Sequence, residues 1–422
     1  MIQTDKILSN FQRSPIMNCI GIVTEYNPFH TGHAYQLNTL AERYPDALRI
    51  VVMSGSFVQR GEPALFDKFT RARWALLNGA HAVIELPTVY ATANAERFAA
   101  GAVRLLHQLG ARALSFGSET NNAALLQKIA AKSSDKAVQE ACRQAMKNGE
   151  FYGTALRQAI IAQYPEAAPI VNQPNALLGL EYTKAIQTYG LNMNLIPVKR
   201  EGEHHNDELT TDWSSGSALR RQIRTNDNKD HLSKTLAPYL PANIIADCQE
   251  KILFNDYTEI ERYHDFILYE SRKLSATQLA SLADFNEGLH QVWPSAGQKE
   301  SWTSALDSLK SKRYSYARLN RMATYTVLGI SRRLQDEAHE TGPQYGRLLG
   351  FTDAARPWLQ RKEFDVPLIQ KWAPFVNTAT GLTAEMATLD QKATDIQKLC
   401  IKNASNRKGG EDFYFTPWYI KK

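Results

Sequence analysis

Residues 21–37 read GIVTEYNPFHTGHAYQL, and this stretch decides how the first part of the chain folds. The apolar run Cys19–Thr24 predicts a buried strand, and the pattern from His33 to Tyr44 predicts a helix after a short turn. In an open parallel sheet, ligands bind at the carboxyl ends of the strands, beside the helices that follow. Because the start of a helix offers free N–H groups and a positive dipole end, the stretch predicts a phosphate site.

Two histidines stand in an HxGH pattern across that turn. Imidazoles at His30 and His33 can donate hydrogen bonds to phosphate oxygens and stabilise the charge that builds on a leaving pyrophosphate. Gly32 allows close approach to the backbone, and the Asn27-Pro28 pair sets the turn. The alternative is that both histidines only cap and pack the start of a helix. The strand before them and the helix after them favour the catalytic interpretation.

Several familiar nucleotide motifs are missing from the sequence. It contains no GxxxxGK[ST] loop, no GxGxxG fingerprint and no protein-kinase signature. Attack at a γ-phosphate and dinucleotide-dependent redox chemistry are therefore disfavoured. The HxGH turn predicts nucleotidyl transfer, in which the α-phosphate is attacked and pyrophosphate leaves.

Composition limits the ligands and the cellular compartment that are compatible with this chemistry. The 422 residues include 49 basic and 43 acidic side chains, and the formal net charge of +6 allows an anionic ligand without demanding a nucleic acid. The four cysteines form no CxxC pair, which argues against a metal–thiolate site and favours a reducing cytosol. No apolar run is long enough to span a bilayer.

The chain changes character along its length. Residues 1–17 are expected to form an N-terminal tail, and residues 18–225 alternate short apolar strands with helices, which predicts an α/β domain with a Rossmann-like parallel sheet. A helical insertion is expected at 121–190. Residues 226–422 contain no convincing strand pattern and predict a mainly α-helical C-terminal domain. The expected strands are Cys19–Thr24, Arg49–Met53, Ala82–Glu85, Ala113–Phe116 and Leu195–Val198.

Two basic segments invite a functional interpretation. Lys68 and Arg71 lie at the start of a predicted helix, where they could meet a nucleotide phosphate or an RNA, or simply face water. Residues 311–333 contain six basic and no acidic side chains, and helical spacing would place tyrosines and arginines on one face. Such a face suits the phosphates and unpaired bases of an RNA loop, although a solvated basic face explains it equally well. The residues concerned are Arg313, Tyr314, Arg318, Arg321 and Tyr325.

The HxGH stretch resembles the signature of the HIGH-type nucleotidyltransferase superfamily, and the chain more narrowly resembles the bacterial tRNA(Met) cytidine acetate ligase family. Further blocks match that family in the same order, which makes the resemblance far more specific than HxGH alone. They are MSGSFVQRGEPA (53–64), AVIELP (82–87), SFGSE (115–119), QPNALLGLEY (173–182) and RYSYARLNRM (313–322).

The resemblance implies a two-step reaction in the cytoplasm. Acetate would attack the α-phosphate of ATP to form acetyl-adenylate and pyrophosphate. The acetyl group would then pass to the exocyclic amine of the wobble cytidine of elongator tRNA(Met). Mg²⁺ is expected to accompany ATP, without a dedicated protein metal site. Neither a membrane nor DNA is expected as a partner.

The resemblance also implies which residues bind ATP. The family's binding stretch maps onto 23–36, with further contacts at Gly117, Asn175 and Arg200. The segment WSSGSALRRQIR (213–224) loosely resembles the second superfamily motif, in which Ser215, Ser217 and Arg220 would hold the β- and γ-phosphates, although the serines are also ordinary helix caps. The 23–36 stretch comprises Val23, Thr24, Glu25, Tyr26, Asn27, Pro28, Phe29, His30, Thr31, Gly32, His33, Ala34, Tyr35 and Gln36.

Two other functions compete with this one. A cofactor-type adenylyltransferase would use the same HxGH chemistry, but it would leave the helical half of the chain without a role. An RNA-binding protein with a vestigial nucleotide site would explain the basic helix, but the intact histidines argue against it. A class I aminoacyl-tRNA synthetase is disfavoured because the chain has no KMSKS-like loop.

Overall fold

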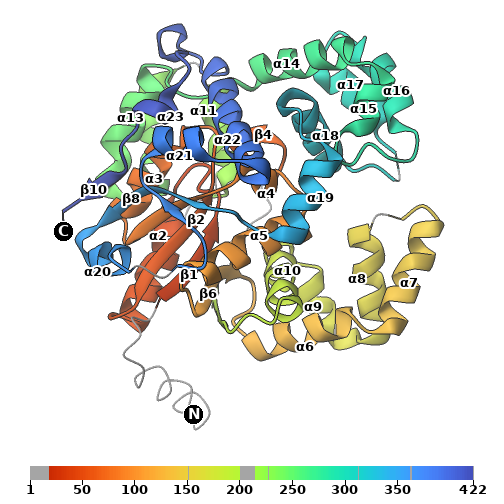
Figure 1. The fold of residues 1–422 in the computed structure, drawn as a ribbon, viewed down its shortest axis with the longest axis horizontal. Coiled ribbons are helices and arrows are strands. Elements are labelled where there is room, and N and C mark those ends of the chain that lie inside the picture. The colour runs from red at the N-terminus through yellow and green to blue at the C-terminus, as the bar shows by residue number, and fades with distance from the viewer. Residues whose placement is uncertain are drawn as a thin grey trace.

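The computed structural model describes residues 19–150, 152–199, 214–226, 228–311, 313–361 and 364–421. Within these residues, eight strands form one central sheet in the order β10-β8-β5-β2-β1-β6-β7, with β9 beside β8 (Figure 1). All neighbours are parallel except β5 and β8. The strands are β1 (Cys19–Thr24), β2 (Leu48–Ser54), β5 (Ala82–Leu86), β6 (Ala113–Ser118), β7 (Asn194–Lys199), β8 (Gly346–Thr352), β9 (Leu368–Ile369) and β10 (Trp418–Ile420).

The sheet separates two hydrophobic cores because side chains alternate along each strand. On β2, Ile50 and Val52 pack into one core, whereas Val51 and Met53 pack into the other. Every residue of β2 is buried, as expected for a strand covered on both faces. The five strands predicted from the sequence are confirmed, with their ends extended by at most two residues.

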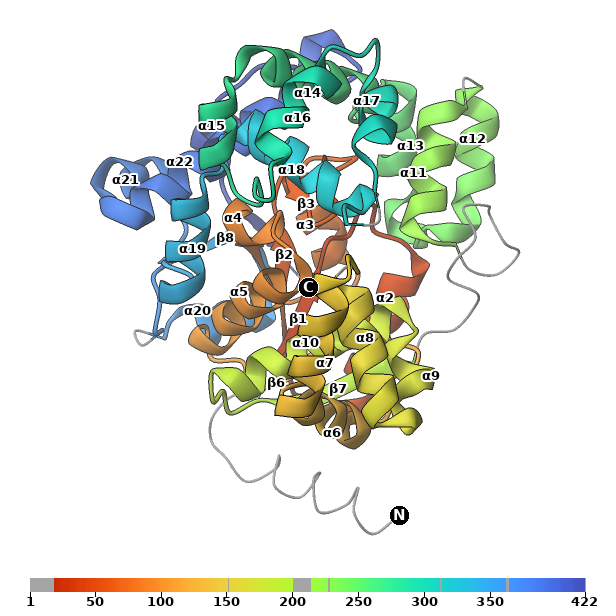
Figure 2. The same ribbon diagram turned by 90° about the vertical axis from the view of Figure 1, so that its right-hand side faces the viewer.

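Helices cover both faces of this sheet. Helices α2 (Thr31–Arg43) and α3 (Lys68–Leu77) supply side chains to one core, and α5 (Ala95–Gln108) and α10 (Pro174–Thr188) supply side chains to the other. The helical insertion expected at 121–190 is confirmed and projects to one end of the molecule (Figure 2). Its other members are α6 (Ala123–Ser133), α7 (Lys136–Lys147), α8 (Tyr152–Gln163) and α9 (Ala168–Val171).

The second half of the chain is mainly helical, as predicted. The longer helices that matter below are α11 (Gly216–Thr225), α12 (Lys229–Leu236), α14 (Ile260–Lys273), α17 (Trp302–Leu309), α18 (Tyr316–Leu328), α19 (Arg332–Thr341) and α22 (Gly381–Leu399). The remaining ones are α13 (Ile245–Leu253), α15 (Ala276–Ser281), α16 (Leu289–Gly297), α20 (Arg356–Leu359), α21 (Trp372–Thr378) and α23 (Glu411–Tyr414).

The expectation that no strand follows residue 225 is wrong. Strand β8 pairs antiparallel with β5, and both β9 and β10 pair with β8, so the C-terminal half completes the sheet begun by the N-terminal half. The partner of β8 lies more than two hundred residues earlier in the sequence, and local pattern contains no trace of that pairing. The division of the chain at residue 225 stays a prediction.

A buried ionic cluster joins the two halves beside this added edge. The Lys68 ammonium lies 2.7 Å from a Glu85 carboxylate oxygen and 2.9 Å from Asp412 Oδ1. Arg347 of β8 donates to Asp412 over 2.5 Å, with a second Glu85 oxygen 3.5 Å away. Burial raises the pKa of Asp412, but Lys68 and Arg347 outweigh it and hold that pKa below its usual range. The cluster therefore ties α3, β5, β8 and α23 together.

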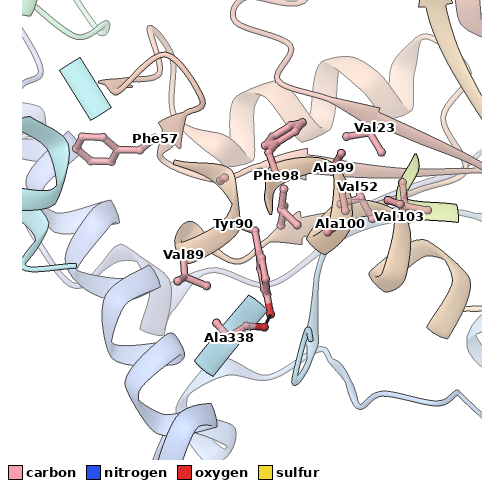
Figure 3. Close-up of a cluster of buried hydrophobic side chains, with 14 of the residues drawn as sticks. Val23, Val52, Phe57, Val89, Tyr90, Phe98, Ala99, Ala100, Val103 and Ala338 are labelled. Carbon is pink, nitrogen blue, oxygen red and sulfur yellow. Dashed lines mark hydrogen bonds between the residues drawn. The ribbon is translucent and has the colours of Figure 1, made fainter. Parts of the chain in front are cut away.

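A second link between the halves runs through the core. Tyr90, in the short helix α4 (Thr88–Ala91), donates a hydrogen bond of 2.6 Å to the carbonyl oxygen of Ala338 in α19 (Figure 3). A Cβ on Gly101 would lie 2.4 Å from the Tyr90 ring, so α5 passes this tyrosine at a distance that only glycine permits. Within the described ranges, the helices lack the combination of length and apolar character that crossing a bilayer requires.

The buried cluster yields a stability prediction. Replacing Arg347 with Met leaves Asp412 and Glu85 with one cation between them, and breaking a buried ion pair in this way costs about 3–5 kcal/mol. We expect Arg347→Met to lower the free energy of unfolding, measured by urea denaturation, by that amount. Arg143→Met, which removes an exposed arginine of α7, serves as the control and should leave the midpoint unchanged. Equal midpoints for the two variants would contradict the linking role of the cluster.

Candidate active site

The two histidines of the HxGH pattern cap helix α2 reciprocally. His30 is the N-cap residue, and its Nδ1 accepts a hydrogen bond from the Gly32 N–H over 3.1 Å. His33 lies in the first turn, and its Nδ1 accepts from the His30 N–H over 3.3 Å. The two rings stack with centroids 3.8 Å apart. The alternative interpretation of the sequence, in which the two histidines cap the helix, is therefore confirmed for the capping itself.

This cap determines where each imidazole carries its proton. A nitrogen that accepts a hydrogen bond from a backbone N–H has no hydrogen of its own, so neutral His30 and His33 must both carry the proton on Nε2. The Nε2 atoms are then donors. Both residues line the neighbouring cavity, so capping and donation are compatible, with one ring nitrogen serving each role.

The cavity beside the histidines lies at the carboxyl ends of the parallel strands. One part has a volume of about 510 Å³ and includes the ends of β1 and the start of α11. A narrower part of about 140 Å³ shares His30, His33 and Asn175 with it and extends between β6 and β7. The first turns of α2, α10 and α11 all border the cavity, and the N-terminal end of a helix carries a partial positive charge. Three helix starts converging on one cavity indicate an anionic ligand.

The start of α11 adds hydroxyls and guanidiniums. Ser215 caps the helix by accepting from the Ala218 N–H, and Ser217 accepts from Arg60 and Arg220 over 3.3 Å each. Arg220 also donates to the Asn27 carbonyl over 2.6 Å, which ties α11 to the turn before the histidines. Ser215, Ser217 and Arg220 all line the cavity, and their contact with the β- and γ-phosphates stays a prediction.

Glu62 neutralises part of this charge. It lies 3.1 Å from Arg220 Nε and 3.4 Å from Arg224 Nη1. Burial raises the pKa of Glu62, but Arg224 and Arg220 outweigh it and hold that pKa below its usual value. Burial in turn lowers the pKa of the Arg220 guanidinium, and Glu62 opposes that change. Both groups are therefore charged near neutral pH.

Asn175 and Gly117 also lie at the cavity. Asn175 does not cap α10; its amide instead donates to Glu119 over 2.8 Å, and the second Glu119 oxygen accepts from the Ala176 N–H. The Glu119 carboxylate thus fixes the first turn of α10 against the end of β6. Gly117 lies on β6 in the narrower part of the cavity, next to Phe116.

The stretch predicted to bind ATP divides into cavity and core residues. Phe29 and Ala34 are buried in the hydrophobic core and hold α2 on the sheet. The Asn27-Pro28 peptide bond is cis. Predicted residues that line the cavity are Val23, Thr24, Glu25, Tyr26, Asn27, His30, Gly32, His33, Tyr35 and Gln36.

Lys68 and Arg71 lie elsewhere, and the expectation that Lys68 meets a phosphate does not fit the structure. The Lys68 side chain is fully buried between Glu85 and Asp412. Arg71 is also fully buried, and it donates to main-chain carbonyls of Glu25 (2.6 Å) and Ser54 (3.0 Å). Arg71 therefore stabilises the loops that follow β1 and β2, and Lys68 belongs to the buried ionic cluster. Arg200 falls outside the described residues.

The basic helix differs from its prediction. Helix α18 begins at Tyr316, so Arg313 and Tyr314 precede it. Tyr325 is fully buried and donates to the Thr92 carbonyl over 3.0 Å, so it cannot stack on a base. The helical face inferred from spacing is turned inward there, because α18 packs on the sheet domain as well as on α14. Arg313 is exposed and Arg318 half-buried.

Several cavity residues were missed. Arg60 and Gln59 arrive from the hairpin of β3 (Phe57–Val58) and β4 (Glu62–Pro63), and the Gln59 N–H donates to Glu25 over 2.9 Å. Phe98 and Tyr182 supply apolar wall, and burial raises the pKa of the Tyr182 phenol, so it stays protonated. The QRGE sequence of the hairpin was the available signal, since charged residues around a glycine mark an exposed turn.

Comparison with known proteins places this site in context. The model of the HIGH nucleotidyl transferase family matches residues 17–412. The chain is 32% identical to the tRNA(Met) cytidine acetate ligase of Thermosipho africanus (strain TCF52B), over 94% of this chain and 98% of that one. It is 35% identical to the protein of the same name from Latilactobacillus sakei subsp. sakei (strain 23K), over 89% and 93%.

Solved structures of a related protein are similar to this chain over almost its whole length. The crystal structure of Thermotoga maritima TmcAL bound with alpha-thio ATP superposes with a TM-score of 0.87 at 29% identity, covering 96% of this chain and all of that one. The apo form of the same protein gives a TM-score of 0.89 with the same coverage.

A substitution can separate the two roles of His30, which are to cap helix α2 and to donate a hydrogen bond from Nε2. Asparagine is a good N-cap, so His30→Asn keeps the acceptor for the Gly32 N–H but loses the Nε2 donor. We expect His30→Asn to keep the wild-type free energy of unfolding and to slow ATP–pyrophosphate exchange by about 100- to 1,000-fold. His30→Ala, as the comparison, should lose both functions and unfold about 1 kcal/mol more easily. Exchange at the wild-type rate in His30→Asn would refute a donor role for this imidazole.

Proposed function

Because the chain belongs to the tRNA(Met) cytidine acetate ligase family of HIGH nucleotidyltransferases, we propose that it activates acetate with ATP and acetylates a tRNA cytidine. The observation that carries this proposal is the reciprocal cap of His30 and His33 at a cavity that three helix starts border. That arrangement suits a triphosphate whose α-phosphate is attacked.

In the first step, an acetate oxygen attacks the α-phosphorus, and the bond from that phosphorus to the bridging oxygen of pyrophosphate breaks. The products are acetyl-adenylate and pyrophosphate. Donors at His30 and His33 Nε2 stabilise the negative charge that builds on the phosphate oxygens. The start of α11, with Ser215, Ser217 and Arg220, holds the leaving pyrophosphate.

The adenosine end of ATP fits the narrower part of the cavity. Gly117 gives the nucleotide close access to β6, and Asn175 is held in place there by Glu119. Mg²⁺ would enter with the phosphates and neutralise their charge, and Glu25 is a carboxylate that lines the same cavity. Arg200, which follows β7 directly, remains a proposed ATP contact.

In the second step, the exocyclic amine of the wobble cytidine of elongator tRNA(Met) attacks the acetyl carbon. The bond from that carbon to the phosphate oxygen breaks, AMP leaves, and the amine nitrogen gives up a proton. Arg313, Tyr314, Arg318 and Arg321 remain proposed RNA contacts, since the first two precede α18 and the other two lie in its first two turns. We place this activity in the cytoplasm, because the four cysteines are buried free thiols, as a reducing compartment favours.

Acetate-dependent exchange tests the activation step on its own. With ATP, acetate and labelled pyrophosphate, the protein should exchange label into ATP without any RNA, because acetyl-adenylate forms before the acceptor is needed. Adding tRNA(Met) should then yield an acetylated cytidine, detected by mass analysis of the RNA. Butyrate serves as the matched control acid, and each extra methylene should discriminate by roughly 10- to 200-fold.

Two results would contradict the proposal. Absence of acetate-dependent exchange in the presence of Mg²⁺ would exclude acid activation. Exchange that requires a phosphate-bearing cofactor precursor instead of acetate would identify the competing class of adenylyltransferase.

A further inference from the structure

A second cavity adjoins the nucleotide cavity. It has a volume of about 420 Å³, within the range of roughly 300–1,000 Å³ that ligand sites occupy. Arg60, Ser217 and Arg220 line both cavities, so the two meet at the tip of the β3–β4 hairpin and the start of α11. The far walls of the second cavity come from α14, α17 and α18, which belong to the C-terminal half of the chain.

The hairpin between the two cavities is fixed against α18. Gly61 has a φ of +80°, and a Cβ there would lie 2.4 Å from the Asn320 carbonyl carbon. No side chain fits at such a distance, so the glycine lets the hairpin backbone rest directly on the helix backbone. The neighbouring residues Arg60 and Glu62 are thereby held at the junction of the two cavities.

Positive charge dominates one wall of the second cavity. Arg60, Arg220, Arg221 and Arg224 line it, against the carboxylates of Glu62 and Glu261. Glu62 forms ion pairs with Arg220 and with the Nη1 atom of Arg224.

The Nε and Nη2 atoms of Arg224 are buried and have no hydrogen-bond partner among the described residues. A buried guanidinium N–H without an acceptor is costly, so negative charge at this wall would be stabilising.

The opposite wall carries rings and neutral polar groups. Trp302 and Tyr263 line the cavity, and Trp302 Nε1 donates to Asn320 Oδ1 over 3.1 Å. His264 also lines it, and burial lowers the pKa of this imidazole, so the ring is neutral near pH 7 with one donor and one acceptor. The Trp302 and Tyr263 rings are both buried and close this wall. The half-buried His264 ring, with one donor and one acceptor, is therefore the group that suits the edge of an unpaired base.

We propose that this second cavity receives the acceptor nucleotide of a single-stranded RNA loop, with its phosphate on the α11 arginines and its base against the wall that carries His264. The inference rests on the proposed function, because it supplies the place from which the amine reaches the acyl-adenylate. A nucleotide is the ligand class that satisfies both walls, since it joins an anion to a planar base with hydrogen-bonding edges.

The test uses variants of the full-length protein that leave the nucleotide cavity intact. Arg221 is exposed on α11 and lines only the second of the two cavities, and so does His264 on α14. The matched control is Lys234→Gln on α12, which removes the same charge from an exposed position that lines neither cavity. Binding of the anticodon stem–loop of elongator tRNA(Met) is followed by fluorescence anisotropy across a salt series.

We expect Arg221→Gln to weaken binding by roughly five- to tenfold and to lower the slope of log affinity against log salt by about 0.7, the value for one phosphate contact to a single strand. His264→Ala should weaken binding by roughly tenfold with an unchanged slope, because a base contact carries no counterion. Lys234→Gln should match wild type, and acetate-dependent ATP–pyrophosphate exchange should stay within about twofold of wild type in all three variants.

The inference is overturned if neither cavity variant changes RNA affinity or salt slope relative to Lys234→Gln. It is also overturned if exchange falls in parallel with RNA binding, because the second cavity would then belong to the path of ATP or pyrophosphate. Failure of the proposed function itself is seen separately, as wild-type protein that shows no acetate-dependent exchange.

Discussion

The reciprocal cap at the start of helix α2 is the interaction on which the rest of the site depends. Two backbone N–H groups occupy the Nδ1 atoms of His30 and His33, and this leaves both Nε2 atoms as donors at the cavity. A histidine in water chooses between two tautomers and adopts many orientations. Here the backbone of the helix fixes the tautomer and the orientation of both rings before any ligand binds. The donors are therefore preorganised where negative charge develops. The backbone N–H groups at the start of the helix therefore also determine which imidazole nitrogens can donate to a ligand.

The sheet explains why one chain can present two cavities side by side. Strand β8 and the cluster of Lys68, Glu85, Arg347 and Asp412 fasten the C-terminal half to the N-terminal sheet. Helices α14 and α18 are thereby held against the β3–β4 hairpin, whose Gly61 permits direct backbone contact with α18. In this account the first half activates an acid and the second half helps to present an acceptor, and Arg60 of the hairpin lines both cavities. Burial of the charges in the linking cluster makes that arrangement sensitive to loss of any one partner.

Sequence alone could predict the elements that local pattern specifies. The run Cys19–Thr24 is β1 to the residue, and the HxGH turn lies where a strand end and a helix start must meet. It could not predict β8, because an edge strand is stabilised by a partner that lies far away in the chain. Helical spacing placed Tyr325 on an exposed face, yet that residue is buried because α18 packs on more than one side. Lys68 shows the same limit, since the carboxylates that bury its charge come from β5 and α23. Arg60 was missed because no pattern reveals which turn approaches which helix.

The tautomer of the two imidazoles is the most direct test of the central claim. Nitrogen-15 NMR of histidine-labelled protein at a pH where the rings are neutral distinguishes a protonated ring nitrogen from an unprotonated one, and His30→Asn and His33→Asn assign the signals among the ten histidines. The account predicts that both His30 and His33 carry the proton on Nε2, with Nδ1 unprotonated, in the ligand-free protein. A proton on Nδ1 of either residue would contradict it, because that nitrogen could then no longer accept the backbone hydrogen bond that fixes the site.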